Sequence, residues 1–369
     1  TTLSINGTTS LEGGSFSTDP ATTVAPASRV ELNGFTNYDG GAITVTGVLR
    51  QDGDASVNAA TTIDGDYFDM DGSSGTFSDW TLDSDLTLNV KGIEDRTTNN
   101  RFDGNLNINN PASLTVSTGD GSWTMDGEMH LDQNGVSNQY LVRGDDINIS
   151  GQVTVTGATA IKSTAHISGS ITLGDPGYLF QLGGGDNTIS GGDIAGPGRL
   201  VAVGTNNNNS LAGFGTISAD IEFSGGEKTD LWADGGTLSL SGTILEVDEI
   251  GTASGTGTLD VVNAWNTSVA GELQLNGGEV TGGGITNDGT TIGHGLITSS
   301  SFVNNSTLTA NGGTLTLDTG TFPDLDGASE TGTVNALDGS VEVLNAAAGN
   351  FFFDGTLNVC VGQSFHSSA

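Results

Sequence analysis

Basic residues are scarce in this sequence. Lys and Arg together number 9 among 369 residues, whereas Asp and Glu number 44, which gives a formal net charge of −35 at pH 7. The imbalance increases along the chain, because no Lys or Arg follows Lys228. Nucleic acids and anionic membrane surfaces bind proteins through basic patches, and a strongly acidic surface repels both. We therefore expect neither as a partner.

Long apolar runs and pairs of cysteines are missing too. The sequence has no uninterrupted apolar stretch of roughly 18 residues, the length that a membrane-spanning helix requires, so we expect no membrane insertion. Cys360 is the single cysteine, which excludes a disulfide within the chain but leaves the redox compartment open. Thr1 stands where an initiator Met would be and no signal-like segment follows, so we expect a processed or excised region. Scarce Lys with abundant Asn, Thr and Gly is typical of exported β-rich proteins and favours an extracellular location.

Residues that favour helices are rare, and residues that favour strands and turns take their place. Gly accounts for 59 of the 369 residues, about twice its usual share of roughly 7%. Thr, Ser, Asn, Asp and Gly fill the space between isolated Leu, Ile and Val. Segments such as "SDLTLNVKG" (84–92) and "DGNLNINN" (103–110) alternate apolar and polar residues and end at Gly or Asn. This period of two predicts short strands that bury one face, and no segment predicts an amphipathic helix.

The strand segments recur along the second half of the chain. Each begins with a Gly-x pair, as in "GGTLSLSG" (235–242) and "GGTLTLDTG" (312–320). Successive first apolar residues lie 21, 14, 23, 19, 19 and 23 positions apart, so the typical repeat is about 20 residues. The aligned residues are Leu238, Leu259, Leu273, Leu296, Leu315, Val334 and Leu357.

A repeat of this length predicts stacking. About 20 residues supply too few inward side chains for a core, so each unit buries them against its neighbours. A parallel β-solenoid does this with hydrogen bonds from coil to coil, about 4.8 Å apart. Gly and Asn suit the corners, and Asn side chains from "TNNNNS" (205–210) and "VNNS" (303–306) are expected to stack there. A sandwich array or a propeller would repeat at roughly 90 or 40 residues instead.

We therefore predict an all-β fold, a right-handed parallel β-helix with coils of about 20 residues. Residues 1–40 are expected to form an N-terminal extended segment or cap, and residues 41–345 the solenoid body. Residues 346–369 are expected to form a C-terminal cap or assembly segment.

The repeat resembles a known family. The segment "ITNDGTTIGHGLITSSSFVNNSTLTANGGTLTLD" (285–318) is similar to the coils of secreted bacterial pectin-lyase-like β-helices, which include autotransporter passengers and haemagglutinin-type adhesins. The likeness is best over residues 230–345. It implies a right-handed parallel β-helix that is exported to the cell surface or beyond. It implies no activity, because this fold includes adhesins, structural fibres and polysaccharide-cleaving enzymes.

The densest acidic stretch, "DGDYFDMDGSSGTFSD" (64–79), is a candidate calcium site. Ca²⁺ requires several hard oxygen ligands at close range, and two Asp residues spaced by one precede a Gly turn here. The stretch departs from the full D-x-D-x-D-G loop and lacks the distal Glu, so a solvated polar turn is the alternative. The candidate ligands are Asp64, Asp66, Asp69 and Asp71.

The same stretch is the best candidate for catalysis. Glycoside hydrolysis needs two carboxyl groups at a fixed separation, and Lys91, Arg96 and Arg101 follow the acidic residues at a short distance in sequence. Solvated loop acids are far more common than such pairs. The four His residues are isolated, and no zinc motif, phosphate loop or nucleophile elbow occurs. We expect no enzymatic activity.

The chain ends indicate self-association. Three consecutive Phe residues in "NFFFDGTL" (350–357) place side chains on both faces of a strand, so one face must meet a cap or another molecule. The first 20 residues carry a strand pattern, and open strand edges pair with further strands. The residues expected at such a joint are Leu3, Ile5, Phe16, Phe351, Phe352, Phe353 and Cys360.

The function that we expect is that of a non-enzymatic extracellular structural or adhesive solenoid that assembles end to end into a fibre or surface layer. Two alternatives remain open at this point. One is a carbohydrate-active enzyme centred on residues 64–101, and the other is a monomeric adhesin that binds glycans.

Overall fold

The structure is a computed structural model, and it describes the parts of the chain that lie in or next to strands. These are residues 2–7, 9–17, 29–52, 54–70, 80–82, 86–95, 100–102, 106–109, 113–117, 122–125, 128–132, 140–143, 146–149, 152–155, 158–161, 164–182, 185–202, 209–224, 229–321, 323–326, 332–344, 356–359 and 364–367. For residues 2–6, 16–17, 52, 67, 69–70, 359, 364–367 and those described within 80–161 other than Leu86, the description is of the backbone alone. The chain divides into two compact units, and each is described by itself. The N-terminal unit comprises Thr1–Gly185 and Gly192–Arg199, and the C-terminal unit comprises Asp186–Gly191 and Leu200–Ala369.

Strands make up both units. Those of the N-terminal unit are β1 (Thr2–Asn6), β2 (Thr9–Leu11), β3 (Gly14–Ser17), β4 (Arg29–Asn33), β5 (Thr36–Asp52), β6 (Ala55–Met70), β7 (Trp80–Leu82), β8 (Leu86–Asp95), β9 (Asn100–Phe102), β10 (Leu106–Asn109), β11 (Ser113–Ser117), β12 (Ser122–Met125), β13 (Glu128–Asp132), β14 (Tyr140–Arg143), β15 (Asp146–Ile149), β16 (Gln152–Val155), β17 (Ala158–Ile161), β18 (Thr164–Ile167), β19 (Ser170–Leu173) and β20 (Leu179–Leu182). The chain passes between the units within β21 (Asp186–Ala195) and β22 (Arg199–Ala202). Those of the C-terminal unit are β23 (Asn209–Ile217), β24 (Asp220–Phe223), β25 (Thr229–Leu240), β26 (Ile244–Thr252), β27 (Thr258–Val261), β28 (Trp265–Asn266), β29 (Ala270–Gly282), β30 (Ile285–Asn287), β31 (Thr290–Ser299), β32 (Phe302–Asn304), β33 (Thr307–Thr319), β34 (Thr333–Leu344), β35 (Thr356–Val359) and β36 (Ser364–Ser367), with one short 3₁₀ helix, η1 (Thr267–Val269).

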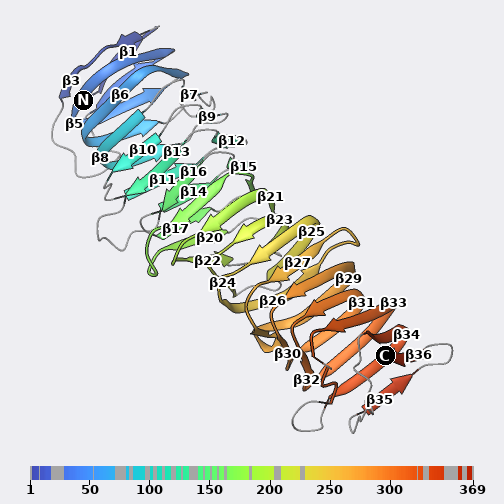
Figure 1. Cartoon of the computed structure of the whole chain (residues 1–369). Helices are drawn as coiled ribbons and strands as arrows, with labels where there is room; N and C mark the ends of the chain where they lie inside the picture. The colour runs from blue at the N-terminus through green and yellow to red at the C-terminus, as the bar shows by residue number, and fades with distance from the viewer. Residues whose placement is uncertain are drawn as a thin grey trace. The chain divides into compact units, whose positions relative to one another are not determined.

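Strands from successive turns pair in parallel, as the sequence predicts. Leu238 of β25 pairs with Leu259 of β27, 21 residues later, and Leu259 pairs with Val280 of β29 after another 21. Turns lie about 21 residues apart, and Figure 1 shows the arrows of neighbouring turns stacked side by side in each unit. The predicted parallel β-solenoid is confirmed, while its right-handed sense stays a prediction. The predicted boundaries at residues 40 and 345 also stay predictions.

The core is a set of inward-facing ladders. Strands such as β27 and β31 alternate buried and half-exposed residues, so every second side chain points inside and packs on its equivalents in the turns before and after. One ladder of fully buried aliphatic residues continues over six strands of the C-terminal unit. Its members are Leu238, Leu259, Val280, Ile297, Leu317 and Val343.

The repeat that we aligned in the sequence combines two different register rows. Leu273 follows Leu259 in that alignment, yet the structure pairs Leu273 with Ile250 of β26, whereas Leu259 pairs with Val280. Each turn places one strand before a glycine corner and one after it, and both strands have the same alternating pattern. The short step of 14 residues therefore runs from one register row to the other, and not between register partners in successive turns.

Polar residues are stacked inside one corner of the C-terminal unit. Thr267, Asn287 and Asn304 are fully buried, and each contacts the next. Thr267 Oγ1 donates a hydrogen bond to Asn287 Oδ1 at 2.8 Å, and Asn287 Nδ2 donates to Asn304 Oδ1 at 2.6 Å. The Asn amides also donate to backbone carbonyls of later residues, Thr307 at 3.0 Å and Leu325 at 2.9 Å. The predicted Asn stacking is confirmed at Asn304, while residues 205–208 lie outside the described part of the chain.

The carboxylate of Asp288 lies on the outer surface of the same corner. Asp288 accepts hydrogen bonds from the amides of Asn266 and Asn305. These two bonds stabilise the charged form and lower the pKa of Asp288 below its usual value. The corner is therefore tied together by polar side chains on its inner and outer surfaces.

The N-terminal unit contains an aromatic pair in its core, and the buried phenol of this pair is hydrogen-bonded. Tyr38 of β5 is fully buried and meets Phe68 of β6 edge to face, with ring centroids 6.5 Å apart. Its hydroxyl group and Gln51 Oε1 are 3.2 Å apart, and Gln51 Nε2 donates to the carbonyl oxygen of Gly34 at 3.1 Å. The buried phenol thus has the partner that an apolar environment requires.

Candidate functional site

A row of outward-facing residues crosses five strands of the C-terminal unit. The register places each residue of the row beside the next, from β27 through β29, β31 and β33 to β34. All five are half-exposed, since they occupy the outward-facing positions of strands whose alternate residues are buried. We call this row the groove ladder: Thr258, Glu279, Leu296, Thr316 and Glu342.

Glycines form the corner beside the groove ladder. A Cβ atom on Gly278 would lie 2.3 Å from the carbonyl oxygen of Gly257, and one on Gly295 would lie 2.3 Å from that of Gly278. No other residue fits where the backbone of one turn contacts the next so closely. The glycines therefore allow successive turns to stack in close contact at this corner, beside the ladder.

The ladder and the corner together enclose a groove with a volume of about 530 Å³. The groove extends over five successive turns, which at a spacing of about 4.8 Å makes it roughly 19 Å long. The residues that line it besides the groove ladder are Gly255, Thr256, Gly257, Gly277, Gly278, Gly295, Thr314 and Leu344.

The groove is acidic and rich in hydroxyl groups. Glu279 and Glu342 are its charged residues, and among the residues whose side chains the structure describes, no Lys, Arg or His lines it. The backbone of His366 on β36 pairs in register with Glu342 at the end of the row. Thr298 Oγ1 donates to Glu279 Oε1 at 2.9 Å, which orients that carboxylate. On the same face, Asp260 accepts hydrogen bonds from Ser239 and Thr281, both at 3.0 Å. The surface therefore presents oriented hydrogen-bond acceptors and repels anions.

His294 occupies the glycine corner near the groove. Its imidazole ring lies against Gly277 on one neighbouring turn and against Gly312 and Gly313 on the other. The sequence predicts a surface or corner position for each His, and for His294 the corner is what the structure shows.

The structure separates the first two residues of the predicted calcium site. On β6, the side chains of Ile63, Asp66 and Phe68 are buried, whereas Asp64 is half-exposed. The alternation of inward and outward positions shifts by one residue at Gly65. Asp66 is 8% exposed and accepts the backbone N–H of Gly47 at 2.9 Å. Asp64 therefore lies at an outward-facing position of the strand, and Asp66 lies at an inward-facing one.

The other two candidate ligands have different surroundings. The backbone of Asp69 pairs in register with Arg50 on one side and with Glu94 on the other. Asp71 lies outside the described residues. Within the part of the chain that the structure describes, no group of three or more His, Cys, Asp or Glu residues could hold a metal ion. The calcium site stays a prediction.

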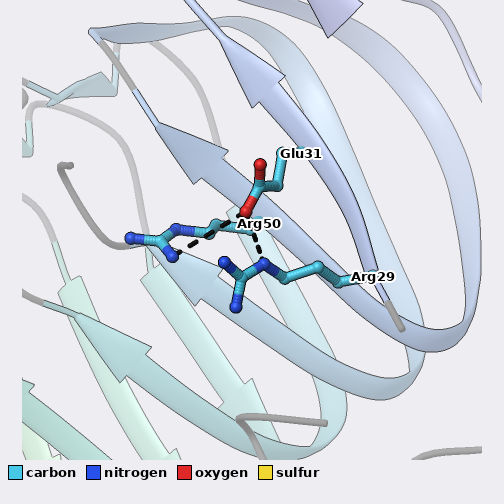
Figure 2. A network of polar contacts seen from close by, with 3 residues as sticks. All are labelled: Arg29, Glu31 and Arg50. Carbon is cyan, nitrogen blue, oxygen red and sulfur yellow. Dashed lines mark hydrogen bonds and ion pairs between the residues drawn. The ribbon is translucent and has the colours of Figure 1, made fainter. Parts of the chain in front are cut away.

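The arginines near the start of the chain are engaged with a glutamate. Figure 2 shows Arg29 and Arg50 converging on Glu31. The Arg29 side chain donates a hydrogen bond to Glu31 Oε1, and Arg50 Nη1 lies 3.9 Å from the same oxygen. Glu31 and Arg50 are register partners on β4 and β5, and the backbone of Asp69 follows in the same register row. Ion pairs between neighbouring strands are typical of a structural surface.

The basic residues of the enzyme hypothesis are described only in part. Lys91 lies on β8 and Arg101 on β9, each with its backbone alone described, and Arg96 lies outside the described residues. The catalytic alternative at residues 64–101 therefore stays a prediction.

The predicted N-terminal joint residues lie on strands at an edge. Leu3 and Ile5 of β1 pair with Val30 and Leu32 of β4, and Phe16 of β3 pairs with Val45 of β5. Among the described strands, β1, β2 and β3 pair on one side only.

The C-terminal end has the same arrangement. β35 and β36 both pair with β34 and with no other described strand. The predicted joint residues Phe351, Phe352, Phe353 and Cys360 lie outside the described part of the chain.

The groove was not predicted from the sequence. Its five ladder residues are of three different types and lie 21, 17, 20 and 26 positions apart, so no motif joins them. The available signal was the glycine pair that precedes each strand, as at Gly277 and Gly278 before Glu279. That signal places a corner but does not give the register between turns.

Comparison of the chain with protein-family models, curated proteins and solved structures found no match. The described residues also contain no helix that is long and apolar enough to cross a membrane. The resemblance to secreted bacterial β-helices therefore rests on the sequence repeat, and the fold rests on the register of its own strands.

Proposed function

We propose that this chain is a non-enzymatic, extracellular structural and adhesive β-solenoid, of the kind found among secreted bacterial β-helices, and that it assembles end to end. The observation that carries the proposal is the pair of edges just described. β1, β2 and β3 present one edge in the N-terminal unit, and β35 and β36 present another in the C-terminal unit.

An exposed strand edge carries unsatisfied N–H and C=O groups, which pair readily with a strand of another chain. A copy that docks in parallel register would continue the ladder at the same spacing of about 4.8 Å. The two edges are different surfaces, so the N-terminal edge of one molecule would pair with the C-terminal edge of the next. Each added molecule would then present a new free edge to a further copy. Such a heterologous contact propagates into a filament unless its rotation closes a ring.

The spacing of the groove carboxylates supports a non-catalytic role. Glu279 and Glu342 are three register steps apart, which corresponds to roughly 14 Å. Glycosidases hold their two carboxyl groups within about 5 to 10 Å of each other. A binding surface does not have this requirement.

A competing peptide tests the assembly. A synthetic peptide of residues 1–17, which contains β1, β2 and β3, should occupy the edge of β35 and β36 and prevent a second molecule from docking. We expect the mass from light scattering to fall as peptide is added, whereas a scrambled peptide of the same composition leaves it unchanged. A mass that stays at that of one chain at every protein concentration, without any peptide, would contradict the proposal.

A further inference from the structure

The groove takes no part in the proposed edge pairing, and its chemistry points to a ligand of its own. We propose that the groove ladder binds a linear oligosaccharide whose sugars carry amino groups. This inference goes beyond the assembly, since a single molecule contains the whole groove.

Charge determines the first property of the ligand. Glu279 and Glu342 project from the ladder, and no Lys, Arg or His is among the described side chains that line the groove. The chain as a whole carries a formal charge of −35. An anionic ligand would be repelled from this surface, whereas ammonium groups would be attracted and would form charge-assisted hydrogen bonds with the carboxylates.

Shape determines the second property. The groove is elongated, because its floor is one register row across five parallel strands. A linear polymer can lie along it, with one repeat unit over each turn if the unit is about as long as the 4.8 Å spacing. A single hexose in a linear chain has about this length, so each successive turn can contact one successive sugar.

The lining identifies the ligand class. Thr256, Thr258, Thr314 and Thr316 present hydroxyl groups, and Leu296 and Leu344 present apolar surface. Sugar rings offer hydroxyl groups at their edges and C–H groups on their faces, so they fit such a mixed surface. A site for small ligands commonly combines apolar lining with a few placed polar groups.

An extended peptide fits the groove less well. The groove floor is the face of a sheet whose strands already pair on both sides, as β29, β31 and β33 do. A peptide strand adds to an open edge, where it gains backbone hydrogen bonds, and this face offers none. We therefore favour the amino sugar, and a cationic peptide serves as a comparison in the test.

The test measures binding of a glucosamine hexamer to the purified chain at low ionic strength by calorimetry. Three comparison ligands are a fully N-acetylated hexamer, a glucose hexamer and hexalysine. Glu279→Gln and Glu342→Gln each remove one charge without changing shape. Glu246→Gln is the matched control, because Glu246 is an exposed carboxylate on β26 that does not line the groove.

We expect the glucosamine hexamer to bind more tightly than the other three ligands. Each groove substitution should weaken its binding about tenfold, in line with loss of one charge-assisted hydrogen bond. The Glu246→Gln control should bind as the unsubstituted chain does.

Failure of the hexamer to bind, or equal binding to the doubly substituted groove, overturns the proposal. Hexalysine binding that is as tight and equally sensitive to the two substitutions overturns the sugar assignment. The readout uses dispersed chain, so it is independent of whether filaments form.

Discussion

At the residue scale, we expect the stability of the fold to depend most strongly on its buried polar side chains. Tyr38 lies in an apolar core, and burial raises the pKa of its phenol far above the ordinary value of 10.0. The folded state therefore keeps the proton that the unfolded state loses. The stability that Tyr38 contributes is complete below about pH 10 and declines as the pH rises further, because the unfolded state then binds fewer protons.

Substitution of Tyr38 tests this pH dependence. In the unsubstituted chain, we expect part of the tyrosinate absorbance to appear only when alkaline pH unfolds the protein. Tyr38→Phe should remove that late component. At neutral pH the variant should lose about 1 kcal/mol of unfolding free energy, because one hydrogen bond to Gln51 is gone. A late component that persists in Tyr38→Phe would show that another phenol is responsible.

Asn287 is the centre of the polar corner. Its side chain accepts hydrogen bonds from Thr267 at 2.8 Å and Thr291 at 2.9 Å, and it donates to Asn304 at 2.6 Å. Asn287→Ala removes the acceptor of two buried hydroxyl groups and the donor to Asn304 Oδ1, which should lower the unfolding free energy by about 2 to 4 kcal/mol. Asn263→Ala is the control, because that exposed amide makes a single hydrogen bond to Ser241. Equal losses for the two variants, measured by denaturant unfolding, would contradict the structural role of the stacked amides.

At the element scale, the glycine corners explain how strands of successive turns approach each other. The Cβ atom of Gly278→Ala would lie 2.3 Å from the Gly257 carbonyl oxygen, whereas that of Gly255→Ala would have no neighbour closer than 3.6 Å. We expect the first variant to lose about 1 to 3 kcal/mol through overpacking and the second to retain its stability. Thermal unfolding of the two variants measures the difference. If both melt alike, the turns are not in contact at this corner.

Strand patterns gave the fold class but not the register. Alternation and Gly boundaries are local properties, so residues such as Leu238 and Leu259 were assigned correctly to repeated strands. Leu296 was aligned with them, yet it faces outward between Glu279 and Thr316. The reason is that the residue after a glycine corner faces inward or outward according to the number of corner residues, which differs between turns.

At the scale of the whole molecule, function depends on features that successive turns build together. The groove combines residues from five turns, and the variable turn length hides it from any sequence motif. The acidic stretch at residues 64–79 shows the opposite case. Its residues are close in sequence, but the reversal at Gly65 places Asp64 and Asp66 in opposite phases. Proximity in a solenoid follows the register between turns more than the distance along the chain.

The central claim is that the chain assembles through its terminal strand edges. Electron microscopy of the purified chain across a range of concentrations, with and without millimolar Ca²⁺, tests it most directly. The account predicts unbranched filaments that lengthen with concentration and that shorten when the peptide of residues 1–17 is added. Dispersed single molecules under every condition would contradict it.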